Sequence, residues 1–286
     1  MNEQFEITEE KNKVEKSTLY LVATPIGNLS DISYRAVKVL SEVDFIAAED
    51  TRNTPKLLGR YGIKKPLVSY YEHNKREKGE QIVSRIKAGE SCALVTDAGT
   101  PAISDPGEDL VVLCREHGVK VVSIPGACAA ITALTLSGLP TRRFCFEGFL
   151  PNTKSERKQR LKELDSEKRT IIIYEAPHHL ISTLNDIYDA FGDRKIALCR
   201  ELTKINEETD FTTVSAAIAS YKEKQPRGEY VLVIDGATDT KKEFDMSVAE
   251  HVDMYISQGM SKMDAIKAAA KDRGVPKSEV YAEINK

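Results

Sequence analysis

Short apolar runs that suit buried strands recur along the first half of this 286-residue chain. They occupy residues 19–23, 45–48, 92–95 and 119–124. The segments between the runs have helical spacing. In the first segment the apolar residues from Ile32 to Val43 fall on one face, and Asp31 is placed to cap the helix. Because strands that alternate with helices form parallel sheets covered on both faces, the pattern predicts an α/β fold.

A second set of elements follows residue 138. We predict strands at 143–149, 170–174, 196–199 and 230–234, and helices at 180–191 and 214–221. A helix of small residues over 127–137 bridges the two halves. A chain of this length has room for two hydrophobic cores. We therefore expect an N-terminal α/β domain over 18–137 and a second α/β domain over 138–236.

The two ends of the chain differ in composition from these domains. Residues 1–17 are polar, and we expect them to form a disordered tail. Residues 237–246 have the composition of a linker. Residues 247–286 predict a module of three helices with a helix-turn-helix pattern, in which Ser261 and Asp264 form a capping box. A weak excess of basic residues in this module leaves nucleic-acid contact and an ordinary solvated surface as alternatives.

The overall composition excludes some classes of protein. The net charge of −3 gives no sign of a nucleic-acid partner, so such a partner must be argued from local patches. The five cysteines are odd in number and form no C-x-x-C pair, which indicates reduced thiols. No run approaches the roughly twenty apolar residues that cross a bilayer. We expect a cytoplasmic protein that makes no membrane contact.

A loop rich in proline and glycine follows the run at 92–95. This proline loop extends from Val95 to Gly107. Proline fixes the backbone and glycine permits close approach of another molecule, so we expect backbone N–H and C=O groups of the loop to face a ligand. We expect the loop to end at a helix, with Asp105 as the cap, Pro106 at the first helical position and Glu108 completing a capping box.

Four turns follow the predicted strands of the first domain. They are residues 24–29, residues 49–52, the proline loop and residues 125–130. In a parallel sheet these turns all lie along the carboxyl edge, where open α/β folds bind their ligands. Neither G-x-G-x-x-G nor the P-loop pattern occurs, which disfavours the usual dinucleotide site and a Walker-type nucleotide site.

Five ordered blocks of the sequence resemble the tetrapyrrole methylase superfamily. They are 24–29, 48–52, 97–107, 174–178 and 199–204. Within the superfamily they are similar to the branch that methylates the ribose 2′-oxygen of a cytidine in 16S ribosomal RNA, in the decoding region of the small ribosomal subunit. The C-terminal helices are similar to the small domain that often ends that branch. The resemblance spans residues 18–236 and implies S-adenosylmethionine in the cleft between two α/β domains, the small ribosomal subunit as the substrate and a homodimer.

Two other functions stay open at this point. An enzyme of the same fold could methylate a ring carbon of a tetrapyrrole or corrin, and such an enzyme would not need the C-terminal helices. A helix-turn-helix regulator could use the α/β body only to sense a ligand, and it would bind duplex DNA without transferring a methyl group.

Family position places the contacts to the cofactor in three of the four turns. The residues are Pro25, Asp97, Gly99, Ala102, Ile103, Ala127 and Ala130. Adenine and the methionine tail need backbone donors and acceptors with little side-chain bulk, which Gly99, Thr100 and Pro101 supply. Methyl transfer from a sulfonium needs no metal, and we expect none.

A ribose hydroxyl is a poor nucleophile at neutral pH, so catalysis needs a base to remove its proton or a cation to stabilise the alkoxide. The candidates are Asp50, Arg52, Glu201 and Lys204. Charged neighbours near a domain boundary can equally form an interdomain network of ion pairs. Because adjacent side chains point in different directions, His178 and the residue after it are a poor metal-binding pair, and we expect His178 to shape the cleft.

Contacts to RNA are predicted at three places. Asn28 lies in the first turn. His73 and Asn74 lie beside two tyrosines and offer stacking and hydrogen bonds to an unpaired base, although an ordinary aromatic pair at a strand end accounts for them as well. The candidates in the basic segment 152–169 are Arg157, Lys158 and Arg160. A solvated amphipathic helix is the equal alternative for this segment.

Overall fold

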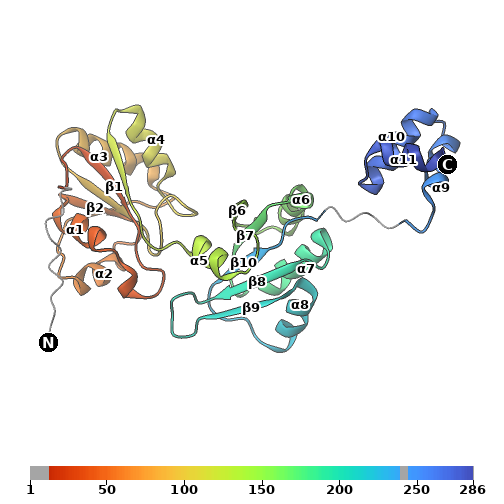
Figure 1. Ribbon diagram of the computed structural model, residues 1–286. Coiled ribbons are helices and arrows are strands. Elements are labelled where there is room, and N and C mark those ends of the chain that lie inside the picture. The colour runs from red at the N-terminus through yellow and green to blue at the C-terminus, as the bar shows by residue number, and fades with distance from the viewer. Residues whose placement is uncertain (1–12, 239–243, 286) are drawn as a thin grey trace. The chain divides into compact units, whose positions relative to one another are not determined.

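The computed structural model describes residues 13–238 and 244–285, and these form two compact units (Figure 1). The first unit ends at Gly236 and the second begins at Ala237. Most of the expected tail at 1–17 and half of the expected linker at 237–246 lie outside the described residues. Of the tail, Glu15 forms an ion pair with Lys120 at 2.7 Å, and the amide of Ser17 donates to the Glu90 carbonyl at 3.1 Å.

The first sheet of the first unit contains five parallel strands. They are β1 (Thr18–Val22), β2 (Phe45–Ala48), β3 (Leu67–Ser69), β4 (Cys92–Val95) and β5 (Lys120–Ile124). Their order is β3-β2-β4-β1-β5, and every pairing is parallel. All four predicted strands are therefore present, and the parallel sheet is confirmed. Strand β3 was not among the predicted strands, because it is short and only partly buried, although a strand end beside Tyr70 was one interpretation of the tyrosine pair.

Four helices cover the two faces of this sheet. They are α1 (Tyr34–Glu42), α2 (Thr54–Arg60), α3 (Lys75–Lys87) and α4 (Glu108–Glu116). Side chains of α1 and α2 pack in one buried cluster, and side chains of α3 and α4 pack in another. The predicted cap of α1 is wrong: Asp31 ends a short 3-10 helix, and the Ser33 hydroxyl accepts the Ala36 amide at 3.1 Å instead.

The second sheet is mixed. Its strands are β6 (Phe144–Phe149), β7 (Thr170–Glu175), β8 (Lys195–Arg200), β9 (Glu208–Thr213) and β10 (Tyr230–Ile234). The order is β6-β7-β10-β8-β9, in which only β6 and β7 are parallel. The four predicted strands are confirmed, while β9 was missed because its sequence, Glu-Thr-Asp-Phe-Thr-Thr, has no apolar run.

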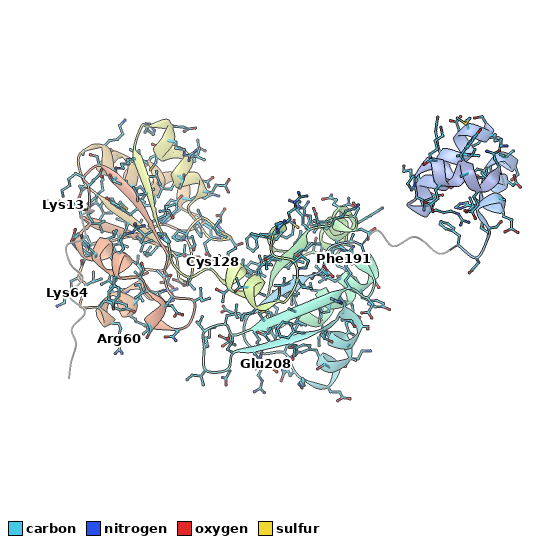
Figure 2. The ribbon with its side chains drawn as sticks, in the orientation of Figure 1. Lys13, Arg60, Lys64, Cys128, Phe191 and Glu208 are labelled. Atoms are coloured by element: carbon cyan, nitrogen blue, oxygen red, sulfur yellow. The ribbon has the colours of Figure 1, made fainter. Side chains whose placement is uncertain are left out.

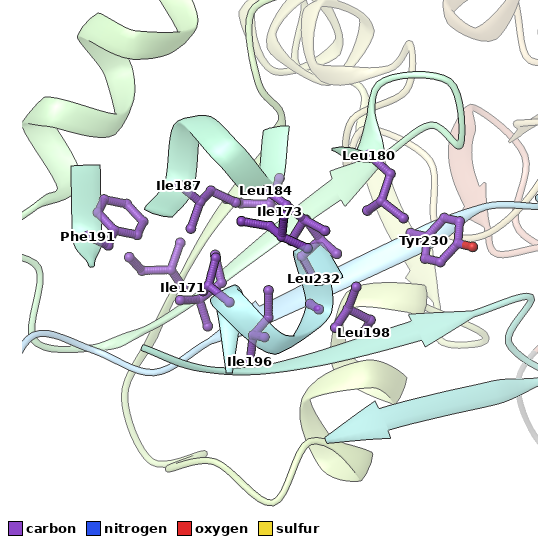
Figure 3. Packing of buried hydrophobic residues seen from close by; sticks show 14 of the residues in the cluster. Ile171, Ile173, Leu180, Leu184, Ile187, Phe191, Ile196, Leu198, Tyr230 and Leu232 are labelled. Carbon is purple, nitrogen blue, oxygen red and sulfur yellow. The ribbon is translucent and has the colours of Figure 1, made fainter. Parts of the chain in front are cut away.

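Helices also cover both faces of the second sheet. On one face lie α6 (Lys154–Leu164), α7 (Leu180–Phe191) and α8 (Val214–Glu223), and Figure 3 shows the core between them and the strands. On the other face lies α5 (Ala129–Leu136), whose residues Ala133 and Leu134 share a buried cluster with Ile172 and Val231. Because side chains alternate along a strand, Ile171 and Ile173 face the first group while Ile172 faces α5. Helix α5 thus leaves the first sheet and packs on the second.

The second unit contains α9 (Val248–Ser257), α10 (Lys262–Arg273) and α11 (Lys277–Ile284). Its small core includes Val252, Ile266 and Val280. Half of the predicted capping box is present: the Ser261 hydroxyl accepts the Asp264 amide at 3.2 Å, while the Asp264 carboxylate accepts that hydroxyl at 2.8 Å and not the Ser261 amide. Among residues 13–238 and 244–285, none of the helices combines the length and apolar character that a membrane span requires.

Candidate active site

A cavity of about 460 Å³ lies where the carboxyl ends of the first sheet meet the second sheet. The predicted turns contribute Ile26, Glu49, several residues of the proline loop, and Cys128, which is labelled in Figure 2. The second sheet contributes Phe149, Tyr174 and Val231, among others. The prediction that the four turns gather along one edge is confirmed, because each of them contributes at least one residue to the lining of this cavity.

Hydrogen bonds hold the proline loop against the neighbouring turns. Thr24 and Gly99 form two backbone hydrogen bonds. The Thr24 amide donates to the Gly99 carbonyl at 2.8 Å, and the Gly99 amide donates to the Thr24 carbonyl at 3.1 Å. The Thr24 hydroxyl donates to the Thr96 carbonyl at 3.2 Å, and the Thr100 hydroxyl donates to the Ala127 carbonyl at 3.0 Å. Three turns from different parts of the chain are thereby fixed relative to one another.

Strained backbone is concentrated in two loops beside the cavity. Ala102 and Ser104 of the proline loop have φ values of 67° and 62°, and Glu201 and Thr203 of the β8–β9 connection have values of 51° and 68°. Left-handed backbone costs a non-glycine residue about 1–2 kcal/mol and persists only where the surroundings enforce it. Such strain is typical of binding and catalytic sites.

Carboxylates form one wall of the cavity. Glu49, Asp97 and Asp105 all line it, and the Asp97 amide donates to a Glu49 carboxylate oxygen at 3.4 Å. Burial, followed by the negative charges of Glu49 and Asp97, raises the pKa of Asp105 to about 7. Burial also raises the pKa of Glu49. This wall favours a bound cation and holds a carboxyl group that can exchange a proton near neutral pH.

The structure corrects the predicted role of Asp105. Helix α4 begins after Gly107, whose φ is 151°, and no side chain caps it. A Cβ atom at Gly107 would lie 3.0 Å from both the amide nitrogen and the Cβ of Ala102, so the loop packs against the glycine itself. Asp105 is therefore turned into the cavity and makes no capping bond to α4.

The basic side chain of the cavity is Lys204. Its Nζ atom lies 2.8 Å from Glu201 Oε1 and 2.9 Å from Glu229 Oε2. Burial opposes the charge, but the hydrogen bonds to these two carboxylates outweigh it, so the pKa of Lys204 is raised. The expected pairing of Glu201 with Lys204 is therefore present. In this state the lysine is a cation and a hydrogen-bond donor, and not a base.

Asp50 and Arg52, the other predicted catalytic pair, lie next to the cavity and do not line it. The Asp50 carboxylate accepts bonds from the Arg52 backbone amide at 2.7 Å and from its guanidinium at 2.8 and 3.0 Å. These bonds lower the pKa of Asp50 to about 2. The side-chain amide of Asn53 donates hydrogen bonds to the carboxylates of Asp50 at 3.3 Å and Asp97 at 3.5 Å. It thereby connects the pair to the acidic wall.

The residues expected to touch a cofactor divide into two groups. Four of them line the cavity: Asp97, Gly99, Thr100 and Ile103. The others do not line it: Pro25, Pro101, Ala102, Ala127 and Ala130. Of these, Ala127 accepts the Thr100 hydroxyl, and the Ala130 amide donates to the Tyr174 hydroxyl at 3.1 Å.

Sequence reasoning assigned no site role to two aromatic residues of the cavity, Phe149 and Tyr174, although Tyr174 begins one of the five blocks. Their ring centroids lie 5.5 Å apart with an edge-to-face geometry. Burial raises the pKa of Tyr174 to about 12, so its hydroxyl stays protonated. Each ring comes at the end of a predicted strand, at the same edge as the turns that we singled out. That position was the signal available for finding them.

The RNA candidates of the basic segment are engaged in ion pairs. Arg157 is buried, and its Nη2 atom lies 2.7 Å from Asp186 Oδ2. This side chain cannot reach a phosphate while that pair holds, so the RNA contact predicted for Arg157 is replaced by a structural role. Lys158 pairs with Asp189 at 3.1 Å, and Arg160 pairs with Glu147 at 2.7 Å, although both remain partly exposed.

The remaining RNA candidates lie on the surface of the first unit. The Asn28 amide donates to the Thr203 hydroxyl at 3.0 Å, which connects the first turn to the β8–β9 connection. The Asn74 side chain accepts the Tyr71 amide at 2.8 Å and donates to the Ser69 carbonyl at 3.2 Å. His73 is exposed. In the part of the chain that the structure describes, no group of three or more His, Cys, Asp or Glu side chains has the arrangement of a metal site.

Comparisons with known proteins agree with this architecture. A family model described as tetrapyrrole (corrin/porphyrin) methylases matches residues 18–218. The chain is 48% identical to Ribosomal RNA small subunit methyltransferase I of Bacillus subtilis strain 168, covering 94% of each protein. It is 47% identical to the protein of that name from Halalkalibacterium halodurans, covering 93% of this chain and 94% of the relative.

A solved structure shares the fold at low sequence identity. It is a uroporphyrin-III C-methyltransferase from Thermus thermophilus, complexed with S-adenosylhomocysteine. The TM-score is 0.54 at 16% identity, and the match covers 76% of this chain and 96% of the solved one. At this identity the likeness establishes the fold alone, which is the two-sheet α/β arrangement predicted from the sequence.

Proposed function

This chain belongs to the tetrapyrrole methylase family, and on that premise we propose that it transfers a methyl group from S-adenosylmethionine to ribosomal RNA of the small subunit. The observation that carries the proposal is the similarity to small-subunit methyltransferases along nearly the whole chain, which includes the C-terminal helices as well as the two sheets. We further propose that the acceptor is the 2′-oxygen of a cytidine in 16S RNA, as the resemblance of the five blocks implies.

The cavity fits the proposed methyl donor. Its volume of about 460 Å³ lies within the range of small-molecule sites, roughly 300–1,000 Å³. The wall of Glu49, Asp97 and Asp105 suits the sulfonium and ammonium charges of S-adenosylmethionine. Backbone groups of Gly99 and Thr100 suit its polar edges, and the rings of Phe149 and Tyr174 offer apolar surface. When bound, the donor supplies an electrophilic methyl group on a sulfonium.

The chain's own residues then have to position the acceptor and manage its proton. Asp105 is the group best matched to accept a proton from a ribose hydroxyl, because its pKa of about 7 lies near the working pH. Asp50, with a pKa of about 2, is a much weaker base. Lys204 is fixed by Glu201 as a cation that can stabilise the oxygen as negative charge develops on it.

The remaining sites are proposals of the same kind. We propose that Asn28, His73, Asn74, Lys158 and Arg160 contact RNA, and that Asp50 and Arg52 stabilise the acidic wall through Asn53. We also propose that the enzyme is a cytoplasmic homodimer. The chromatographic mass of the free protein tests the dimer.

The test of function is transfer of a labelled methyl group to small ribosomal subunits from a strain that lacks the enzyme. Digestion to nucleosides and mass spectrometry would locate the label. We expect it on the ribose of a single cytidine. Label on a base would contradict the 2′-oxygen as acceptor, and label on an added uroporphyrinogen but not on RNA would contradict the RNA substrate.

A further inference from the structure

A second cavity, of about 370 Å³, lies at the end of the second sheet. Its charged side chains are Arg200 at the end of β8, Lys224 and Arg227 in the connection from α8 to β10, and Glu208 at the start of β9, which Figure 2 labels. Tyr221 and Tyr230 line it as well, with ring centroids 5.9 Å apart in an edge-to-face geometry. Both tyrosines are buried, so they form a fixed apolar base beneath the charged groups.

These two cavities have opposite charge. Six acidic side chains and one lysine line the first cavity, whereas three basic side chains and one glutamate line the second. Arg200 is neutralised by Glu208 at 2.7 Å. Lys224 and Arg227 form no ion pair with any acidic side chain within residues 13–238, and both are exposed. The second cavity therefore presents two uncompensated cations to solvent.

The two cavities are neighbours across the end of β8. Cys199 and Glu201 line the first cavity, while Arg200 between them lines the second. This follows from the alternation of side chains to opposite faces of a strand. Tyr230, which pairs with Arg200 in the sheet, lines both cavities. Because Cys199 and Arg200 face opposite sides of the sheet, an RNA strand that contacts both cavities has to pass around the end of β8.

We propose that the second cavity binds a backbone phosphate of the RNA, adjacent to the ribose that enters the first cavity. The inference rests on the proposed function. An acidic cavity suited to a cationic methyl donor repels phosphates, so the polyanionic substrate needs a basic anchor outside that cavity and close to it. Arg227 offers a planar donor group for phosphate oxygens, and Lys224 adds a point charge. Phosphate contacts of this kind fix the register of a nucleic acid without reading its sequence.

The test compares two double variants with the same change of charge. The cavity variant, Lys224→Glu with Arg227→Glu, reverses the charge of two side chains that line the cavity. The control variant, Lys195→Glu with Lys222→Glu, reverses the charge of two exposed lysines of β8 and α8 that do not line it. Binding of a single-stranded oligoribonucleotide is measured by fluorescence anisotropy at salt concentrations from about 50 to 300 mM. Over this range the affinity of phosphate contacts falls steeply with salt, so the slope can be determined. Methyl transfer to the small subunit and calorimetric binding of S-adenosylmethionine are measured on the same proteins.

We expect the cavity variant to weaken RNA binding about tenfold or more and to lower the slope of log K against log salt by about 1–1.5, as for two lost phosphate contacts on a single strand. Its KM for the RNA substrate rises, while kcat and the affinity for S-adenosylmethionine stay within about twofold. A thermal unfolding midpoint like that of the wild type shows that the fold is intact, and the milder pair Lys224→Gln with Arg227→Gln should give an intermediate loss.

Equal losses in the cavity and control variants would overturn the proposal, because they would reflect net charge alone. Inorganic phosphate that binds the wild type and not the cavity variant, without any change in RNA binding, would assign the cavity to a free anion and also overturn it. If the wild type transfers no methyl group to RNA while RNA binding still depends on Lys224 and Arg227, the proposed function fails and the phosphate site stands.

Discussion

Gly148 of β6 lies against Ser104 of the proline loop so closely that a Cβ atom on the glycine would come within 2.8 Å of the serine hydroxyl oxygen. Gly148 also has a φ of 63°, just after the register shift between Phe146 and Gly148. Strand β6 belongs to the second sheet, and the proline loop extends from the first. The contact therefore brings the two walls of the cavity together at a position where only glycine avoids both a steric and a conformational penalty.

The first prediction follows from this contact. Gly148→Ala should destabilise the protein by about 1–2 kcal/mol through left-handed backbone, and it should weaken binding of S-adenosylmethionine several-fold by displacing the proline loop. Gly62→Ala is the matched control, because Gly62 has a φ of 68° and open space around its Cβ position. The control variant should lose a similar free energy of unfolding and keep its affinity for S-adenosylmethionine. Denaturant unfolding and calorimetry measure the two effects, and equal affinities in both variants would contradict the prediction.

The second prediction concerns stability and Asp105. Its pKa is raised from 3.8 to about 7 on folding, so the stability contributed by the protonated form is present below pH 4 and is lost as the pH rises towards 7. Asp105→Asn keeps an uncharged side chain at every pH. Because the group is partly exposed, we expect a gain of only about 1 kcal/mol at pH 8 and none near pH 4. Denaturant unfolding at the two pH values checks this, and a loss of stability at pH 8 would refute it.

The third prediction concerns the rate. If Asp105 accepts the proton, kcat/KM for the cofactor should rise with pH up to about 7 and then level off. Asp105→Asn should lower the rate about 100-fold or more and abolish this rise. Glu108→Gln, a change at a neighbouring exposed carboxylate of α4, is the control and should leave the profile unchanged. A variant Asp105→Asn that retains the wild-type profile would exclude Asp105 as the base.

The fourth prediction concerns Lys204. Lys204→Gln removes the cation held by Glu201 and should lower kcat by about 100-fold, as for other groups that stabilise developing negative charge. Lys204→Arg keeps the charge and should restore part of the rate. Lys195→Gln, at the opposite end of β8, should have no effect. Single-turnover transfer to the small subunit measures each variant, and an effect on KM alone would indicate that Lys204 acts only in binding.

The fifth prediction concerns the C-terminal unit, in which His251 is buried and accepts a bond from Arg273 Nε at 3.1 Å through its Nδ1 atom. Burial, followed by the charge of Arg273, lowers the pKa of His251, although Asp272 opposes the shift. A lowered pKa means that stability is present above the unfolded value of about 6.5 and is lost as the pH falls. We therefore expect the free energy of unfolding to fall as the pH drops below about 6.5. NMR titration of His251 should give a midpoint below 6.5, and Arg273→Gln should raise it.

The sequence was most informative where a strand is buried on both faces. The apolar runs of β2, β4 and β10 predicted those strands to the residue, because every side chain in them is buried. The two missed strands, β3 and β9, are both edges of their sheets. An edge strand has one neighbour and an exposed side, so it need not be apolar. The edge strands β5 and β6 were predicted because they do carry apolar runs, whereas β3 has only three residues and β9 has no apolar run.

The four turns of the first domain also located one wall of the cavity, since turns after parallel strands share an edge of the sheet. They did not identify which charged side chains enter it. Asp105 stands in a pattern that is typical of a helix cap, yet it lines the cavity and caps no helix, in a loop that packs closely at Gly107. Arg157 stands in a basic run, yet it is buried against Asp186, which lies 29 residues further along the chain.

What the sequence determined by itself was therefore the order of the apolar strands and of the turns and helices that follow them, because local spacing and burial encode these directly. What only the tertiary structure decided was the electrostatic state of the site: an acidic cavity beside a basic one, and a carboxyl group with a pKa near neutrality. The reason is physical. A pKa depends on burial and on charges within a few ångströms, and those neighbours come from segments that folding alone brings together.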